Sequence, residues 1–278
     1  MEWLEEHKLP VGKWSKAVVD WLTDNAQFIF SALETVLEQV ITAILFLLQT
    51  PPAFVVVGVA CLLAWVTKKS LPLVIAVALG LLFIINQGYW EETTETLTLV
   101  LASAIVCMAL GVPAGIFLAH HPRAYAVARP VLDLMQTLPT FVYLIPAIIF
   151  FGLGMVPGLV ATVIFVIPAP IRLTQLGISS TPKEMVEAGQ AFGASSRQLL
   201  WKVELPSAMP QIMAGLTQTI MLSLSMVVIA ALVGADGLGV PIVRALNTVN
   251  TSLGFEAGFV IVVVAILLDR LLRVESKS

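Results

Sequence analysis

Seven long apolar runs divide this sequence and limit its fold more than any other feature. They cover residues 52–67, 71–87, 97–118, 134–153, 158–171, 212–233 and 257–272. A bilayer core is about 30 Å thick, and roughly 20 apolar residues cross it as an α-helix. The runs are continuous and lack the alternation of barrel strands, so their backbone hydrogen bonds are satisfied in lipid only by helices. The sequence therefore predicts an all-α protein with about seven transmembrane helices.

The small number of charged residues excludes most other classes of protein. Of 278 residues, 58% are hydrophobic and 12% are charged, and the mean hydropathy is +0.95. Soluble domains are about 25% charged, so we expect no separate catalytic domain. The net charge of −3 provides no basic face for nucleic acid, which we exclude as a partner. Cys61 and Cys107 lie within apolar runs, where cysteine is typically a small buried side chain.

The positions of the basic residues predict the topology, because lysine and arginine are retained in short cytoplasmic loops. Such residues follow the first, third, fifth and seventh runs, and the loop after the second run is acidic, with Glu91 and Glu92. The basic residues concerned are Lys68, Lys69, Arg123, Arg129, Arg172, Lys183, Arg197, Lys202, Arg270, Arg273 and Lys277. We therefore place the C-terminus in the cytoplasm and the N-terminus outside.

Residues 28–48 are apolar enough to suggest an eighth span, but a polar stripe runs along them. The stripe consists of Ser31, Glu34, Thr35, Glu38, Gln39 and Thr42 at helical spacing. A glutamate at the bilayer centre costs about 2.5–3.5 kcal/mol, so an interfacial amphipathic helix is preferred to a span. We divide the chain into a tail with this helix (1–49), two accessory transmembrane helices with an acidic outside loop (50–96) and a core domain (97–278).

Several motifs are missing from the sequence, and their absence narrows the function. There is no G-x-x-x-x-G-K-[ST] loop for nucleotide phosphates and no histidine or cysteine pattern typical of zinc sites. We predict no catalytic residue, metal or cofactor on this chain, and interpret His120 and His121 as solvated or facing headgroups. The middles of the runs lack the ionisable residues that ion-coupled carriers bury. Energy is therefore expected from another subunit.

Residues 172–211 form the longest cytoplasmic loop and have the pattern of two short helices. Thr181-Pro182-Lys183-Glu184 fits a capping box with proline at the first helical position, and this helix stops at Gly193. A second helix begins near Ser195 and ends at Leu205-Pro206. The pair predicts a compact projection into the cytoplasm. An amphipathic loop lying on headgroups is the alternative.

This loop resembles the EAA motif of ABC-importer permeases, E-A-A-x3-G-x9-I-x-L-P. The similar residues are Glu187-Ala188-Gly189, Gly193 and Val203-Glu204-Leu205-Pro206, with Gly189 in place of alanine and Val203 in place of isoleucine. The resemblance implies a type I ABC importer permease fold, in which this loop docks on an ATPase subunit. The residues that it implies for this contact are Glu187, Ala188, Gly189, Phe192, Gly193, Leu205 and Pro206.

Three further segments resemble the permeases of glycine betaine, proline betaine and choline importers. They are 133–146, 218–231 and 234–239, while 86–95 is most similar to the choline-type branch. The resemblance implies import of a quaternary ammonium compound across the bacterial inner membrane, with choline the first expectation and glycine betaine or proline betaine the alternative. It also implies a second copy of the chain, two ATPases that bind ATP and Mg²⁺, a separate periplasmic or lipid-anchored binding protein and surrounding lipid.

Polar residues on otherwise apolar helices are the candidates for the translocation path. They are Gln136, Thr137, Thr140, Tyr143, Gln218, Thr219, Ser223 and Ser225, although serine and threonine also bond to their own helix. Five prolines between 139 and 170 predict kinked helices there. Asp236, in the outer loop, either attracts a cation or the binding protein, or caps a turn.

Two questions remain open from the sequence. Gly111-x-x-x-Gly115 and Gly154-x-x-x-Gly158 provide small helix faces, which we assign to packing within the chain rather than to a dimer contact. A self-sufficient carrier or channel is the competing class of function.

Overall fold

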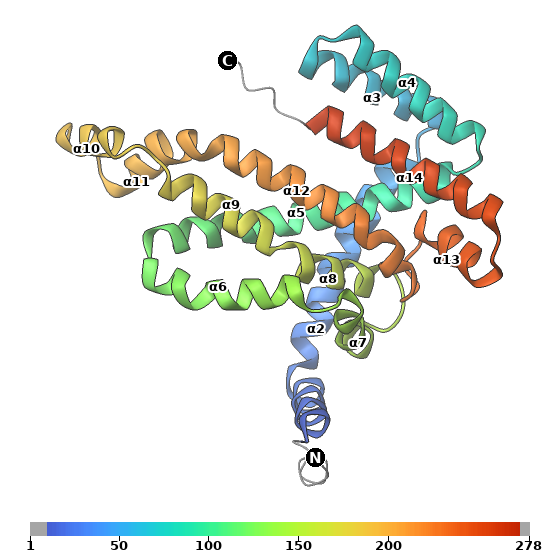
Figure 1. The fold of residues 1–278 in the computed structure, drawn as a ribbon, viewed down its shortest axis with the longest axis horizontal. Helices are drawn as coiled ribbons and strands as arrows, with labels where there is room; N and C mark the ends of the chain where they lie inside the picture. The colour runs from blue at the N-terminus through green and yellow to red at the C-terminus, as the bar shows by residue number, and fades with distance from the viewer. Residues whose placement is uncertain (1–9, 273–278) are drawn as a thin grey trace, which may run out of the picture.

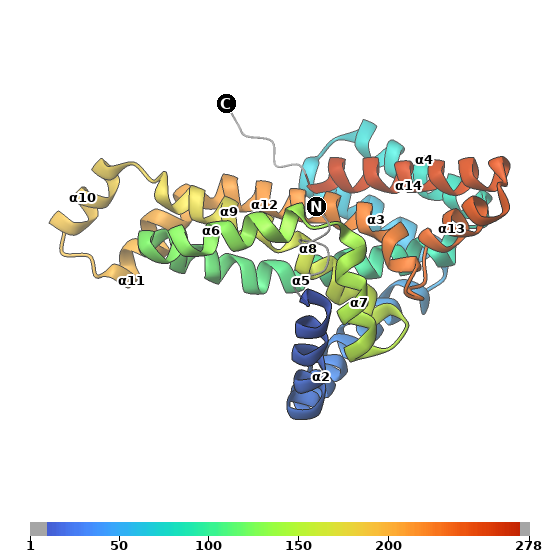
Figure 2. The same ribbon diagram turned by 60° about the horizontal axis from the view of Figure 1, so that its bottom comes forward.

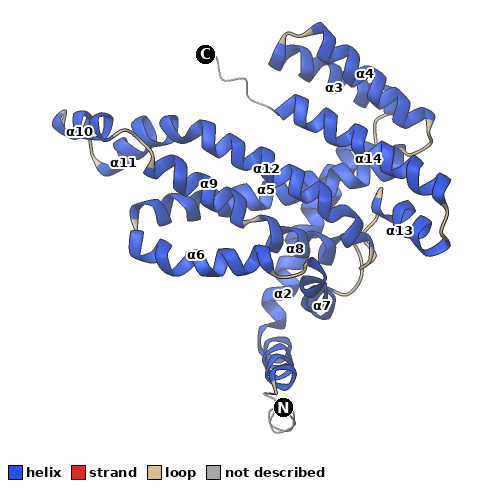
Figure 3. Ribbon diagram, in the orientation of Figure 1, coloured by secondary structure: helices blue, strands red, loops and turns tan. Residues whose placement is uncertain are grey.

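The computed structural model describes residues 10–272, and all regular secondary structure in this range is helical (Figure 1 and Figure 3). The predicted all-α fold is confirmed. The elements are α2 (Val11–Gln49), α3 (Ala53–Lys68), α4 (Leu71–Asn86), α5 (Trp90–His120), α6 (Pro122–Thr137), α7 (Thr140–Phe151), α8 (Met155–Val166), α9 (Pro168–Ser179), α10 (Lys183–Ala191), α11 (Ser196–Leu199), the π-helical turn η1 (Leu200–Glu204), α12 (Leu205–Ala231), α13 (Gly239–Thr248) and α14 (Thr251–Leu272). Arg273 and Lys277 of the predicted topology lie outside the described residues.

The long helices run back and forth between two ends of the molecule. Helices α10 and α11 lie at one end and α13 lies at the other (Figure 1 and Figure 2). Helices α5, α9 and α14 run toward the α10 end, and α12 runs back (Figure 1). The direction of the chain therefore alternates as the topology prediction requires. The assignment of the α10 end to the cytoplasm stays a prediction.

The helices differ from the predicted runs in length. Five are long and apolar enough to cross a membrane: Gly12–Gln49, Trp90–His120, Met155–Ser179, Ser196–Ala231 and Thr251–Leu272. The predicted run 134–153 is not one helix, because α6 and α7 meet at an angle of 94°. Leu138 has extended backbone there, as a residue before proline prefers, and Pro139 caps α7. Helices α3 and α4 are shorter apolar helices.

Helix α2 is longer than the predicted interfacial helix, and one side of it belongs to the core. It crosses the direction of the long helices and contacts α5, α7 and α8 (Figure 1). Leu37 and Ile41 are buried, and the ring of Phe30 stacks on that of Phe150 at 4.1 Å. The predicted polar stripe lies elsewhere on the helix, with Glu38 exposed. Residues 28–48 are therefore amphipathic as predicted, and their apolar side packs on protein. Helix α2 is long and apolar enough to cross a membrane, so the interfacial placement stays a prediction.

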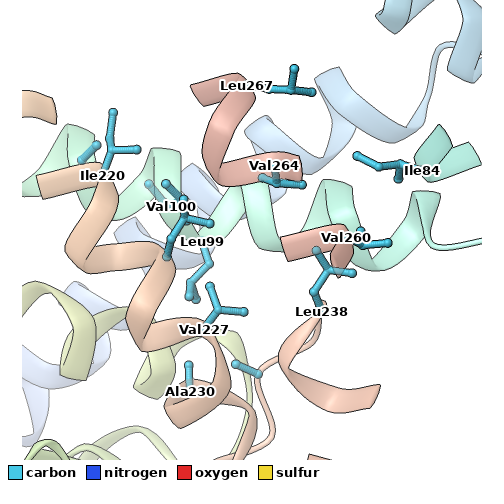
Figure 4. Packing of buried hydrophobic residues seen from close by; sticks show 14 of the residues in the cluster. Ile84, Leu99, Val100, Ile220, Val227, Ala230, Leu238, Val260, Val264 and Leu267 are labelled. Carbon is cyan, nitrogen blue, oxygen red and sulfur yellow. The ribbon is translucent and has the colours of Figure 1, made fainter. Parts of the chain in front are cut away.

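The main core lies where α5, α12 and α14 meet. Leu99, Val100 and Val227 are almost fully buried and lie close together, and Val260 on α14 is a buried member of the same cluster (Figure 4). Helices α5 and α9 also approach closely, because an added Cβ on Gly115 would lie 2.6 Å from Cβ of Thr174. Similarly, an added Cβ on Gly111 would lie 2.9 Å from Cγ of Pro170 and one on Gly158 2.9 Å from Cβ of Ala235. The assignment to packing within the chain is confirmed for Gly111, Gly115 and Gly158, whereas Gly154 is the N-cap of α8 and a Cβ there would meet nothing within 4 Å.

Candidate functional site: the end segment and the polar helix faces

Residues 181–204, here called the end segment, project from one end of the molecule (Figure 2). They comprise α10, α11 and η1, and α10 contains no buried residue. Phe192 is 93% exposed and Trp201 is 64% exposed, although both are large and apolar. Glu187 and Ala188 are exposed as well. The two-helix projection predicted from the sequence is present, and it shows an apolar and charged surface outside the bundle.

The start of α10 differs from the predicted capping box. Pro182, not Thr181, is the N-cap residue, and no side chain caps the helix. The Thr181 hydroxyl is buried and has no hydrogen-bond partner among the described residues. A capping box forms instead at α11, where Ser195 and Gln198 bond to each other's backbone N–H groups. Because Pro182 occupies the N-cap position, Thr181 lies one residue before it and does not cap the helix.

The end of α10 agrees with the prediction. Gly193 has a φ of 78°, which glycine adopts without strain. Its N–H donates to the Gln190 oxygen at 2.8 Å, and the Ala194 N–H donates to the Gly189 oxygen at 3.0 Å. These bonds satisfy the last carbonyls of the helix and turn the chain toward α11.

Gly189 allows α10 to pack against the second helix. An added Cβ at this position would lie 2.6 Å from Cδ2 of Leu199, which is itself buried. The departure from the alanine of the motif therefore has a local reason. The small residue admits the leucine, and the pair fixes the angle between the two short helices.

Leu205-Pro206 does not end the second helix, contrary to the prediction. Helix α11, η1 and α12 form one candidate span from Ser196 to Ala231. The N–H of Leu205 donates to the Leu200 oxygen in the wider π turn, and Pro206 follows within the first turn of α12. A π turn changes the bonding register just where proline lacks a donor, so the helix continues.

The loop predicted over 172–211 is also shorter in the structure. Helix α9 extends to Ser179, and α12 is already packed on it at Ala208, whose Cβ would lie 3.0 Å from a Cβ added to Gly177. This close packing keeps both flanks helical. The end segment alone therefore lies outside the bundle.

Three of the eight candidate path residues are buried, and two of them, Ser223 and Tyr143, make hydrogen bonds to another helix. Thr219 and Ser223 are fully buried. The Ser223 hydroxyl lies 2.8 Å from the Thr219 oxygen and 2.7 Å from the hydroxyl of Ser103 on α5. The hydroxyl of Tyr143 donates to the Met135 oxygen at 2.7 Å, across the bend between α6 and α7. Within one chain these groups are structural.

The other five candidates lie at the surface in two groups. Gln218 and Ser225 are exposed and lie seven residues apart on one face of α12. Thr137 is exposed, and Gln136 and Thr140 are half-buried, beside the bend. No single cavity among the described residues brings the eight side chains together. A path that uses them must be completed by another surface.

Asp236 lies in a group of acidic side chains at the end opposite the end segment. Together with Glu91, Glu92, Glu95 and Arg244 it lines a hollow of about 240 Å³. Burial, followed by the charges of Glu256 and Glu92, raises the pKa of the neighbouring Tyr89. The predicted turn cap is not made by Asp236; instead the Leu238 N–H donates to Oγ1 of Thr96 at 2.9 Å. The end opposite the end segment therefore has a negative field.

His120 is exposed, as the interpretation of a solvated side chain expects, but it also makes a contact that the interpretation did not include. Its Nε2 lies 2.9 Å from Oε2 of Glu204, so the end of α5 is joined to η1. The two residues are separated by 84 positions, and no local pattern connects them. Sequence reasoning had no means of finding this contact.

Comparison with known proteins decides the family. The family described as "Binding-protein-dependent transport system inner membrane component" matches residues 111–275. This chain belongs to that family. The predicted resemblance to ABC-importer permeases is thus confirmed, and the permease is a multi-pass protein of the inner membrane. Among residues 10–272, no group of three histidine, cysteine or acidic side chains could hold a metal ion.

Two relatives match the permease over nearly its whole length. The glycine betaine/carnitine transport permease protein GbuB of Listeria monocytogenes is 43% identical over 97% of this chain and 96% of its own. The glycine betaine transport system permease protein OpuAB of Bacillus subtilis is 42% identical over 98% of this chain and 97% of its own. The choline transport system permease protein OpuBD of Bacillus subtilis is 36% identical over 57% of this chain and 69% of its own.

A solved structure confirms the fold. The inward-facing MetNI methionine ABC transporter matches with a TM-score of 0.58 and 21% identity, over 63% of this chain and 88% of the matched chain. The predicted type I ABC importer permease fold is therefore present. At this identity the likeness concerns the fold alone.

Proposed function

We propose that this chain is the membrane subunit of an ATP-driven importer for a betaine-type quaternary ammonium compound. The observation that carries this is the full-length similarity to GbuB and OpuAB, whose names specify glycine betaine. The choline permease OpuBD matches a shorter part at lower identity. Glycine betaine or a close analogue is therefore preferred to choline, which was the first expectation from the sequence.

The end segment is the proposed contact with the ATPase subunits. It lies outside the bundle, and its exposed Glu187, Ala188 and Phe192 form a surface that no described part of this chain covers. Gly189 and Gly193 set the turns of the segment, and Leu205 and Pro206 form its junction with α12. Motion of a docked ATPase would reach α12 directly, because η1 and α12 form a continuous helix.

The proposed path lies between two copies of the permease. The exposed Gln218 and Ser225 on α12, with Thr137 near the bend, provide polar groups on a surface that a single chain leaves open. At the outer end, the acidic hollow beside Asp236 attracts a cationic group, and a separate binding protein delivers the substrate there. ATP and Mg²⁺ are assigned to the ATPase subunits.

Uptake by the complete importer tests the substrate. The permease, its ATPase and its binding protein are placed in vesicles, and entry of labelled glycine betaine is measured. The measurement is repeated with excess unlabelled glycine betaine and with excess choline as competitors. We expect ATP-dependent uptake that glycine betaine inhibits more strongly than choline does. Stronger inhibition by choline restores the choline assignment. Uptake without the ATPase contradicts the importer and favours a self-sufficient carrier.

A charge reversal tests the ATPase contact. Glu187→Lys should abolish ATP-dependent uptake and reduce co-purification of the ATPase, because it places the wrong charge on the docking surface. Glu184→Lys, on the same helix and also exposed, is the matched control. Normal uptake by Glu187→Lys would show that the end segment does not couple ATP hydrolysis to transport.

A further inference from the structure

His120, the last residue of α5, has a hydrogen-bond acceptor at each ring nitrogen. Its Nδ1 lies 2.9 Å from the backbone oxygen of Ile116, and its Nε2 lies 2.9 Å from Oε2 of Glu204. The Glu204 side chain is 13% exposed and that of His120 is 43% exposed. The contact therefore joins the end of the long helix α5 to the π turn η1, the last part of the end segment.

The number of protons decides whether both contacts can be hydrogen bonds. A neutral imidazole has one N–H donor and one acceptor nitrogen, whereas the protonated ring has two donors. Both neighbours of His120 are acceptors, one a carbonyl and the other a carboxylate. A neutral ring that donates to Ile116 turns a lone pair toward the Glu204 oxygen, which is repulsive. Both bonds form only when the His120–Glu204 pair holds one more proton.

The adjacent histidine is different and provides a matched comparison. Nδ1 of His121 lies 2.8 Å from the Phe117 oxygen, and its ring stacks on that of Phe117 at 4.3 Å. A neutral ring satisfies this single acceptor. His121 therefore has no need of an additional proton.

Other charged groups near this end do not replace Glu204. Arg172 on α9 is paired with Asp133 on α6 at 2.6 Å. The neighbouring elements also carry Arg123 and Arg129 on α6, Lys183, Glu184 and Glu187 on α10, Arg197 on α11 and Lys202 on η1, while α8 and α12 carry no charged residue. In the part of the chain that the structure describes, Glu204 is the ionisable side chain hydrogen-bonded to His120.

We propose that His120 and Glu204 form a proton-dependent latch that positions the end segment against α5. Histidine gains and loses its proton between about pH 5 and pH 8. The proton-bound form makes the contact, so the latch is closed at low pH and opens when the pair loses its proton as the pH rises. If the end segment is the ATPase contact, as proposed above, ATP hydrolysis drives transport more tightly when the latch is closed.

The protonation of His120 can be observed directly. The sequence has three histidines, His7, His120 and His121, so ¹⁵N-histidine NMR of the full permease in nanodiscs gives few signals. His120→Gln and His121→Gln assign them. We expect the His120 ring to carry protons on both nitrogens up to a higher pH in the wild type than in Glu204→Gln. Titration of His120 at the same pH in both proteins would overturn the latch.

The transport consequence is measured on the complete importer. We expect the ratio of substrate transported to ATP hydrolysed to fall several-fold from about pH 6 to about pH 8 in the wild type. His120→Gln, whose amide donates at every pH, should flatten this profile, and His121→Gln should keep it. The role is contradicted if the wild-type ratio is constant, or if His120→Gln follows the wild type.

The two proposals fail in different ways. The NMR titration measures the latch without ATPase, binding protein or substrate. Normal ATP-driven uptake by Glu187→Lys, together with a His120 titration that depends on Glu204, would reject the ATPase contact and retain the latch. A Glu204-independent titration with loss of uptake in Glu187→Lys would do the opposite.

Discussion

At the scale of single residues, glycines determine how closely the helices approach, because they have no side chain. Gly115 on α5 admits Thr174 and the Ile171 oxygen of α9, to which an added Cβ would come within 2.7 Å or less. Gly189 admits the flexible end of Leu199. A clash with backbone cannot be relieved by rotating a side chain, whereas a leucine methyl can move. Gly189 therefore tolerates an added methyl group better than Gly115 does.

Gly115→Ala should destabilise the permease by about 1–3 kcal/mol, because the added methyl group forces α5 and α9 apart. Thermal unfolding in detergent measures this as a lower Tm. Gly58→Ala is the control, since a Cβ there meets nothing within 4 Å. An unchanged Tm for Gly115→Ala would mean that the two helices are not in this close contact.

At the scale of elements, prolines and backbone register decide where helices stop. Pro139 lies at the 94° bend between α6 and α7, as the predicted kinks require. Pro146 lies inside α7 and Pro168 lies within the candidate span Met155–Ser179, so these two do not end a span as Pro139 does. Pro206 is tolerated because η1 has already changed the hydrogen-bond register. A proline thus removes one backbone hydrogen bond of a helix, and the packing around it determines whether the helix ends there.

The attachment of α2 can be tested at the same scale. Phe30→Ala should weaken the packing of α2 on the α7 end by about 1 kcal/mol, because the stacked contact with Phe150 is lost. Hydrogen exchange of the α2 amides should become faster. Phe28→Ala is the matched control, since that ring is 85% exposed. Equal exchange in both variants would indicate that α2 is held by other contacts.

At the scale of the whole molecule, the polar groups of the proposed path face away from the chain's own core. Gln218 is exposed on α12, while its neighbour Thr219 is fully buried against the bundle. A single chain therefore leaves the path incomplete. The second copy, the ATPases and the binding protein supply the missing surfaces in the proposed assembly.

Cysteine labelling distinguishes the two faces of α12. In a protein with Cys61 and Cys107 replaced by alanine, Gln218→Cys should react with a small polar thiol reagent in the assembled importer, and added glycine betaine should slow the reaction. Thr219→Cys should remain unreactive because its side chain is buried. Labelling of Gln218→Cys that substrate does not affect would remove this face from the path.

The sequence by itself determined the helical class, the alternating direction of the chain and the two helices of the end segment. It also determined that α10 stops before Gly193. These features follow from the cost of exposing backbone groups to lipid and from the dihedral freedom of one glycine, which are local properties. Full-length similarity then favoured betaine over choline.

Only the tertiary structure decided which polar residues are buried, where α2 packs, that the helix continues through Pro206, and that His120 meets Glu204. Serine and threonine at Ser103 and Thr219 look the same in sequence as the exposed Thr137 and Ser225. Contacts between residues 84 positions apart depend on how whole helices pack together, and no local pattern records that packing.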